Sequence, residues 1–228
     1  LPIFNFFLIY DIITRKFSFK NYQEDLHLGI LVILFSLLIY FFVIPNEGFA
    51  NVLLSITSAF STSGLTTYSS NTDLSLFFLL LTIVGGSLIS TSSGFKYTRI
   101  YILFKISYQE IYRLVKPINI VDKNLYNSEN KIDNEDVKIA FLVFIFFLIS
   151  IFILSSILTF DYLTFENSFK LSILTLTNTV SSSLYGVDNF SFLDLNNFTK
   201  MSLILFMILG KVEIIAFIYL IKRIIFRE

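Results

Sequence analysis

Small hydroxylic residues follow a short apolar segment in the stretch from Ala50 to Thr66. The apolar part has about ten residues where about 20 are needed to cross a membrane, so a segment that enters the bilayer and turns back fits the pattern. Irregular backbone is tolerated at that depth only where it lines water or is enclosed by protein. Successive carbonyl oxygens in such a loop can replace the hydration shell of a cation, and glycine supplies backbone freedom. The residue types therefore predict an ion filter at Ser61, Thr62, Ser63, Gly64 and Leu65.

A second stretch has the same order of features. A short, half-polar segment from Phe165 to Thr177 is followed by a loop that we predict to be a second filter, formed by Asn178, Thr179, Val180 and Ser181. An offset of 117 residues places Thr62 on Thr179, Ser63 on Val180 and Gly64 on Ser181. Neither loop carries an ionised side chain, which agrees with coordination by backbone oxygens. We expect K⁺ to bind at Thr62, Ser63, Thr179 and Val180; the alternative for such a loop is an extracellular turn rich in serine and threonine.

Small residues also break the apolar span that begins at Leu74. Eight of the ten residues from Gly85 to Gly94 are Gly, Ser or Thr, which is enough to unwind a helix and expose polar backbone. We predict a gate formed by Gly85, Gly86, Ser87, Ser90, Thr91, Ser92, Ser93 and Gly94. The alternative is a tolerated kink or a small-residue face where helices approach closely.

Four charged residues lie near or inside apolar spans: Lys96, Arg99, Lys211 and Glu213. A charge at the centre of a bilayer costs at least about 2.5 kcal/mol unless it is paired or hydrated. Arg99 fits pairing or snorkelling at the inner surface. We expect Lys211 to project into the cavity below the filter and limit its cation occupancy, and Glu213 to balance Lys96 or Arg99. The offset of 117 residues also places Lys96 on Glu213, and Gly94 on Lys211.

Composition limits the function classes. With 55% hydrophobic residues, 28 phenylalanines and a mean hydropathy of +0.75, the chain has more apolar surface than a soluble core can bury, which predicts a polytopic membrane protein. A formal net charge of zero provides no general attraction to nucleic acid. The absence of cysteine excludes disulfides and thiolate chemistry, and the single histidine, His27, fits an interfacial residue better than a zinc ligand.

The apolar spans that position these loops run from 28 to 44, from 74 to near 112 with the polar break inside, from 137 to 160, and from 201 to near 221 with an interruption from Gly210 to Glu213. They predict an all-α polytopic membrane protein with two membrane-pore-membrane repeats whose second spans are broken. The expected divisions are an interfacial or cytosolic lead-in (1–26), a pore repeat (27–116), a cytosolic loop (117–136) and a second pore repeat (137–228). Because the chain starts with Leu1 rather than methionine, it fits a portion of a longer protein.

Lysine and arginine are distributed unevenly between the two sides of these spans. The filter-side stretches 43–74 and 161–200 contain only Lys170 and Lys200, whereas the other side holds most of the basic residues. Cytoplasmic loops carry the excess of Lys and Arg. The filters are therefore expected to face outward, with both termini in the cytosol.

The sequence resembles the C-terminal half of the Trk/Ktr/HKT superfamily of potassium transporters, in particular the bacterial TrkH-like membrane subunit. The matching stretches are Ser61 to Thr66, Gly85 to Ser87, Ser90 to Arg99, Leu103 to Lys105, Arg113 to Pro117, and Leu209 to Glu213. The resemblance implies four repeats around one pore, of which this chain supplies the third and fourth. It also implies a homodimer, a cytosolic nucleotide-binding regulatory subunit, a gate in the third repeat and residence in the bacterial inner membrane.

The expected function is uptake of K⁺ down its electrochemical gradient, without catalytic residues and with no cofactor beyond the transported ion. Na⁺ is the alternative, because Ser181 stands where the fourth filter of the family usually has glycine and a filter serine accompanies sodium transport in plant relatives. A second alternative is an ion-coupled carrier of an organic solute, since broken helices serve such carriers too. That alternative needs polar solute-binding side chains at the midplane. A membrane enzyme has few candidate catalytic groups.

Overall fold

The computed structural model describes residues 2–14, 22–43, 48–65, 74–116, 124–126, 132–161, 163–180, 183–187 and 192–212. Helices dominate these residues, and the only β-type pairing among them consists of isolated bridges such as Val84 with Phe95. The helices are α1 (Phe6–Ile13), α2 (Gln23–Phe42), α3 (Phe49–Phe60), α4 (Ser75–Ile83), α5 (Tyr97–Val115), α6 (Asn134–Thr159), α7 (Phe165–Leu176) and α8 (Asn197–Val212), with 3₁₀ turns η2 (Ser183–Tyr185) and η3 (Phe192–Asp194).

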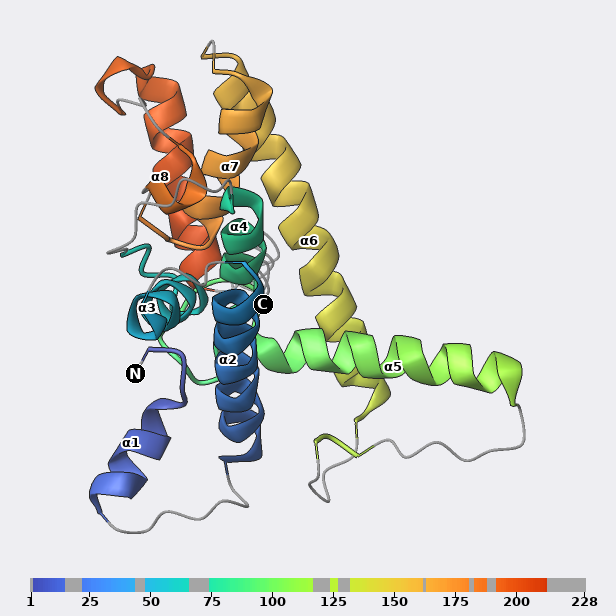
Figure 1. Cartoon of the computed structure of the whole chain (residues 1–228). Coiled ribbons are helices and arrows are strands. Elements are labelled where there is room, and N and C mark those ends of the chain that lie inside the picture. Colours follow the sequence, from blue (N-terminus) through green and yellow to red (C-terminus); the bar gives the residue numbers. More distant parts are fainter. Residues whose placement is uncertain are drawn as a thin grey trace.

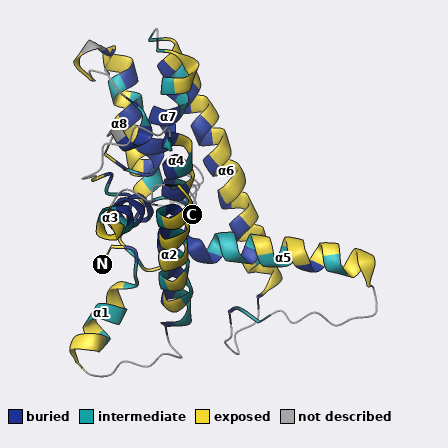
Figure 2. Ribbon diagram, in the orientation of Figure 1, coloured by how far each residue is buried: buried dark blue, intermediate teal, exposed yellow. Residues whose placement is uncertain are grey.

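Two of the described helices, α2 and α6, are long and apolar enough to cross a membrane. The 26 residues of α6 have a mean hydropathy of 3.0 in their most apolar window, and at 1.5 Å per residue they extend about 39 Å, more than the hydrocarbon core requires. A capping box starts this helix: the Asp133 backbone N–H donates to the Asp136 carboxylate at 3.2 Å. Much of the α6 ribbon is coloured as exposed in Figure 2, and the exposed residues of this helix include Phe141, Ile149 and Phe152.

The helices α3 and α7 have 12 residues each, which gives a length of about 18 Å, too short to cross a bilayer. The Thr164 hydroxyl caps α7 by accepting from the Asn167 backbone N–H at 3.4 Å. Both helices are buried toward their C-terminal ends, where Ala59, Phe60 and Leu176 are at most 1% exposed. Each short helix therefore ends inside the protein, immediately before a predicted filter loop.

Helix α4 lies between two groups of helices and contacts both (Figure 1). On one side it packs against α3, which also contacts α2; on the other it packs against α7, which contacts α6 and α8. One hydrophobic core extends through this arrangement and includes Phe60, Phe78, Leu154, Leu176 and Tyr185. In Figure 2 the buried residues gather where these helices meet. Helix α5 crosses the start of α6 and then projects away from the other helices (Figure 1).

The structure differs from the predicted spans at two points. Helix α4 ends at Ile83 and α5 begins at Tyr97, so the break is longer than the predicted stretch from Gly85 to Gly94. The predicted interruption at Gly210 is wrong over the described residues, because α8 stays helical through Val212. A Cβ at Gly210 would lie 1.8 Å from the Leu176 carbonyl oxygen, so this glycine permits close packing of α8 on the end of α7 rather than a break. Glu213 lies outside the described residues.

Candidate functional site

The two predicted filter loops are in direct backbone contact. Gly64 has a φ of +70°, and a Cβ there would lie 2.3 Å from the Val180 carbonyl oxygen and 3.0 Å from Cγ2 of Thr179. Only glycine satisfies both conditions, because the conformation disfavours side chains and no space exists for one. The fold thus brings Ser61 to Leu65 beside Asn178 to Val180, although the two segments are far apart in the chain. Ser181 lies outside the described residues.

Both loops leave their short helices in the same way. Thr62 and Asn178 have the left-handed φ values of 55° and 52°, and the first turn after each helix makes the same backbone bonds. These are Thr62 N to Ala59 O (3.0 Å), Ser63 N to Ser58 O (3.1 Å), Asn178 N to Thr175 O (3.1 Å) and Thr179 N to Leu174 O (2.9 Å).

This geometry corrects the register between the loops. Helices α3 and α7 begin and end 116 residues apart, not 117. Thr62 therefore corresponds to Asn178, Ser63 to Thr179, and Gly64 to Val180. The sequence comparison paired threonine with threonine, but the helix ends decide which positions are equivalent. Val180, rather than Ser181, occupies the position of Gly64.

Hydroxyl groups of the loops bond to one another and to helix ends. Ser63 Oγ lies 3.0 Å from Ser58 Oγ and 3.1 Å from Ser61 Oγ. In the second loop, Thr177 Oγ1 and Thr179 Oγ1 are 2.8 Å apart. These bonds fix the side chains against the short helices, so that the hydroxyls support the loop and the backbone carbonyl oxygens are the better candidates for ion coordination.

A cavity of about 890 Å³ lies beside the first filter loop. Ser61, Ser63 and Leu65 line it, together with apolar residues of α2, α3 and the N-terminal segment. The arrangement can offer the backbone oxygens of the loop to an ion in a space whose other walls are mostly apolar.

The predicted gate forms a closed loop from Val84 to Lys96, hereafter the 84–96 loop. Its two ends pair through Gly85 N to Phe95 O and Phe95 N to Ile83 O, each at 2.9 Å. The loop contacts the first predicted filter loop, since the Ser93 backbone N–H donates to Thr62 Oγ1 at 3.2 Å. Predicted filter and predicted gate residues are therefore joined directly.

Lys96 is 7% exposed and folds back into this loop. Its ammonium donates to the carbonyl oxygens of Ser92 (2.8 Å) and Ser90 (3.1 Å) and to Ser90 Oγ (3.3 Å). A buried ammonium needs such partners, because an unpaired buried charge is strongly destabilising. Arg99, partly buried in the first turn of α5, donates its backbone N–H to the Lys96 carbonyl at 3.0 Å.

Lys211 reaches the same loop from α8. Its ammonium donates to the Thr91 carbonyl oxygen at 2.7 Å, although the two residues are 120 positions apart. Three of the four predicted pore charges, Lys96, Arg99 and Lys211, thus lie in or against the 84–96 loop. The fourth, Glu213, falls outside the described residues.

Several contacts of this loop were missed by sequence reasoning. Glu24, in the first turn of α2, accepts hydrogen bonds from the Leu88 backbone N–H at 2.9 Å and from the Thr98 hydroxyl. The N-terminal segment, from Pro2 to Asn5, lies along the loop. There the Ile3 carbonyl oxygen accepts from the Ser87 backbone N–H at 2.9 Å. The available signal was a carboxylate pair, Glu24 and Asp25, directly before an apolar span.

A buried lysine on α7 was also missed. Lys170 is 5% exposed; its ammonium lies 2.6 Å from the Glu166 carboxylate and 3.4 Å from the Gly186 carbonyl oxygen. These contacts join the second short helix to the chain that follows the second filter loop.

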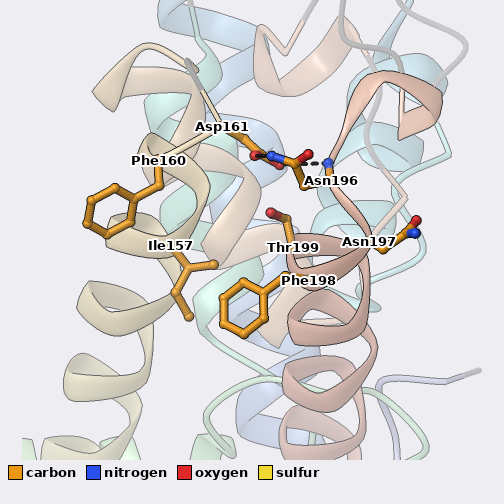
Figure 3. Close-up of a pocket in the computed structure, with 7 residues that line it drawn as sticks. All are labelled: Ile157, Phe160, Asp161, Asn196, Asn197, Phe198 and Thr199. Carbon is orange, nitrogen blue, oxygen red and sulfur yellow. Dashed lines mark hydrogen bonds between the residues drawn. The ribbon is translucent and has the colours of Figure 1, made fainter.

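A second cavity, of about 490 Å³, lies where α6 ends and α8 begins (Figure 3). Asp161 accepts hydrogen bonds there from both the backbone and side-chain nitrogens of Asn196, just before α8. A hydrogen bond from Thr199, together with those from Asn196 and the charge of Lys200, lowers the pKa of the Asp161 carboxyl. These contacts connect the end of α6 to the start of α8.

Comparison with known proteins found a matching family and two similar proteins. Residues 68–226 match the family described as TrkH, cation transport protein. The Trk system potassium uptake protein TrkG of Escherichia coli (strain K12) is 30% identical over 246 aligned positions, which cover 100% of this chain and 48% of the relative. The crystal structure of the potassium transporter TrkH from Vibrio parahaemolyticus has a similar fold, with a TM-score of 0.79 and 22% identity over 96% of this chain and 49% of that one. The chain spans about half the length of these relatives and belongs to the TrkH family of cation transport proteins.

Proposed function

We propose that this chain forms half of a pathway for K⁺, supplying the third and fourth of four membrane-pore-membrane repeats. The observation that carries the proposal is the backbone contact of Gly64 with Val180, because it brings the ends of two short helices to one place. The family match and the half-length coverage of both relatives support it. The ion moves inward down its electrochemical gradient, and no covalent step is required.

In this proposal the ion loses water at backbone oxygens of Thr62, Ser63, Thr179 and Val180. Such coordination needs carbonyls aimed at a common axis, which the left-handed turns at Thr62 and Asn178 and the hydroxyl bonds behind the loops support. Na⁺ remains the alternative ion. The corrected register changes the argument for Na⁺, because Val180, and not Ser181, is equivalent to Gly64. Val180 lacks the backbone freedom of glycine, so we expect ion selectivity to be altered at Val180.

The 84–96 loop serves as the gate. Thr62 connects it to the filter, while Lys96 braces it from within and Lys211 holds it from α8. An ammonium bound to a carbonyl of the loop both restrains it and places positive charge near the route of a cation. The loop must lose some of these bonds when it moves.

The proposed setting is a bacterial inner membrane, with the filters outward and the termini in the cytosol. The membrane assignment follows from the family and the two candidate spans, and the orientation from the scarcity of basic residues on the filter side. As in the superfamily that the sequence resembles, the assembled transporter is a homodimer with a cytosolic nucleotide-binding subunit.

Flux in liposomes tests the proposal. The assembled transporter, reconstituted with a K⁺ gradient, should take up rubidium as a K⁺ substitute, and excess K⁺ should compete with that uptake more strongly than Na⁺. Stronger competition by Na⁺ would establish the sodium alternative. Accumulation of an organic solute without rubidium flux would overturn the proposal in favour of a carrier.

The gate is tested by removing the ammonium of Lys211. Lys211→Gln weakens the hydrogen bond to the Thr91 carbonyl, and a hydrogen bond to a charged group contributes about 1.5–3 kcal/mol. The loop should therefore open more readily, and rubidium uptake should rise several-fold. Lys200→Gln is the matched control, because Lys200 is also on α8 and also donates to a backbone carbonyl, that of Leu193 at 3.0 Å, away from the loop. Equal effects of the two changes on uptake would count against the gate.

A further inference from the structure

We propose that Glu24 is a positioning residue for the 84–96 loop and sets how readily the loop moves. The inference rests on the proposed role of the loop as a gate, and it concerns a residue outside the predicted filter, gate and pore charges. Glu24 is on α2, whereas Lys211 reaches the loop from α8.

One carboxylate oxygen of Glu24 holds two points of the chain. Oε1 accepts from the Leu88 backbone N–H at 2.9 Å and from the Thr98 hydroxyl. Leu88 is inside the loop, whereas Thr98 is in the first turn of α5, just after the loop ends. Glu24 therefore holds the loop against the helix that follows it, and the bond to Leu88 must break if the loop moves away from α2.

Charge makes this anchor stronger than a neutral one. Hydrogen bonds to an ionised acceptor are roughly twice as strong as neutral ones. Glu24 is in the first turn of α2, where the helix dipole favours an anion. The same contact would therefore oppose loop movement less if the residue were glutamine.

The neighbouring carboxylate supports the loop indirectly. Asp25 is 4% exposed and accepts from the Asn5 backbone N–H at 2.8 Å. This bond holds the N-terminal segment, which lies along the loop through Ser87 N to Ile3 O (2.9 Å) and Ser92 N to Pro2 O (3.3 Å). A Cβ at Gly86 would lie 2.3 Å from the Ile3 carbonyl oxygen, which shows how closely the segment approaches the loop.

Two opposite restraints consequently act on a short stretch of the loop. Glu24 binds the backbone N–H of Leu88 from α2, and Lys211 binds the carbonyl of Thr91 from α8. The carboxylate acts on a donor and the ammonium on an acceptor, so neither residue can replace the other. Releasing Leu88 should free the loop on the α2 side even while Lys211 stays bound.

A thiol probe on the loop tests this inference apart from transport. The chain has no cysteine, and the Leu88 side chain is 47% exposed, so Leu88→Cys introduces a single reporter while keeping the backbone N–H that Glu24 binds. In the assembled transporter carrying Leu88→Cys, adding Glu24→Ala should raise the rate of reaction with a charged thiol reagent about tenfold, the effect of losing one charge-assisted bond. Glu24→Gln should raise it less, since the amide oxygen still accepts.

Two further variants complete the design. Thr98→Val keeps the side-chain shape and removes one donor to Glu24, and it carries the test if Glu24→Ala fails to fold. Its expected effect has the same direction and is smaller. Glu110→Ala is the control, because Glu110 forms an exposed ion pair with Arg113 at 3.1 Å on α5 and should leave the thiol reaction rate unchanged.

Rubidium uptake, measured on the same samples, separates the two proposals. We expect uptake to rise together with the thiol reaction rate. A transporter that passes no rubidium but whose thiol reaction rate still rises in Glu24→Ala would overturn the proposed function and leave the anchor in place. A folded Glu24→Ala protein with normal uptake and an unchanged thiol reaction rate overturns the role of Glu24.

Discussion

Glycine at position 64 allows the two predicted filter loops to approach each other. Its φ of +70° is in the region where side chains are strained, and its neighbour is the backbone of Val180, which cannot rotate away as a flexible side chain would. Val180, at the equivalent position of the second loop, has a side chain that is 59% exposed. The loops therefore leave their helices alike, with left-handed φ values at Thr62 and Asn178, and differ at the next equivalent turn position, where Gly64 has a positive φ and Val180 does not.

Gly64→Ala should abolish rubidium uptake. The added Cβ would lie 2.3 Å from the Val180 carbonyl oxygen. The strained backbone would destabilise the folded protein by a further amount of about 1–3 kcal/mol. Gly48→Ala is the matched control, because its φ is −66° and the nearest atom to its Cβ is the Asn51 side chain at 4.0 Å. Uptake that survives in Gly64→Ala at the level of Gly48→Ala would show that contact between the loops is not required.

Packing of α8 on the end of α7 is the contact between elements that positions the second loop. Gly210 lets α8 approach the Leu176 carbonyl, and one turn before it the Met207 carbonyl accepts from Asn178 Nδ2 at 2.9 Å. At the other end of α8, Asp161 holds Asn196. Helix α8 is thus fixed at both ends relative to the α6 and α7 pair.

Gly210→Ala should destabilise the folded protein. Its Cβ would meet the Leu176 carbonyl oxygen at 1.8 Å. Overpacking of this kind typically lowers the free energy of unfolding by about 1–3 kcal/mol. Gly29→Ala, also within a helix, meets only the Phe4 ring at 3.7 Å and should be neutral or stabilising by up to about 1 kcal/mol. Thermal unfolding in detergent measures both. An unfolding temperature for Gly210→Ala at or above that of Gly29→Ala would contradict the close packing.

Asp161 should make thermal stability depend on pH in the acid range. Hydrogen bonds from Thr199 and Asn196 lower its folded pKa. This interaction therefore stabilises the protein above the unfolded pKa of about 3.9, and the contribution is lost as the pH falls through the folded pKa. Asp161→Asn should lower the unfolding temperature at neutral pH and reduce its decline on acidification. Parallel pH profiles for the two proteins would exclude this role.

At the scale of the whole molecule, the contacts cross from one half of the chain to the other. Gly64 meets Val180, Thr91 binds Lys211, and α4 packs against α7. The described halves therefore form one hydrophobic core, and the filter side and the basic side of the molecule have a fixed relation to each other. That relation makes the proposed orientation testable with single residues.

Cysteine labelling in intact cells should reveal the orientation. Leu193 lies on the filter side and is 86% exposed, whereas Glu135 is exposed at the start of α6 on the opposite side. An impermeant thiol reagent added outside should label Leu193→Cys and should label Glu135→Cys only after the cells are opened. The reverse pattern would invert the proposed topology.

The sequence alone was sufficient for the membrane class, the family resemblance and the positions of the short helices and their loops. Composition, span length and runs of small residues are local properties, so they can be read without knowing which segments touch. The sequence did not predict that the helix continues through Gly210. The reason for a glycine there is the close approach of the Leu176 carbonyl, which is distant in the chain.

Only the tertiary structure decided which positions are equivalent and which residues meet. The one-residue register between the loops follows from where α3 and α7 end, and helix ends are the least certain part of a sequence-based prediction. The contacts of Lys211 with Thr91 and of Glu24 with Leu88 join residues 120 and 64 positions apart. Such pairs are set by helix packing, which places distant side chains together without leaving a local pattern in the chain.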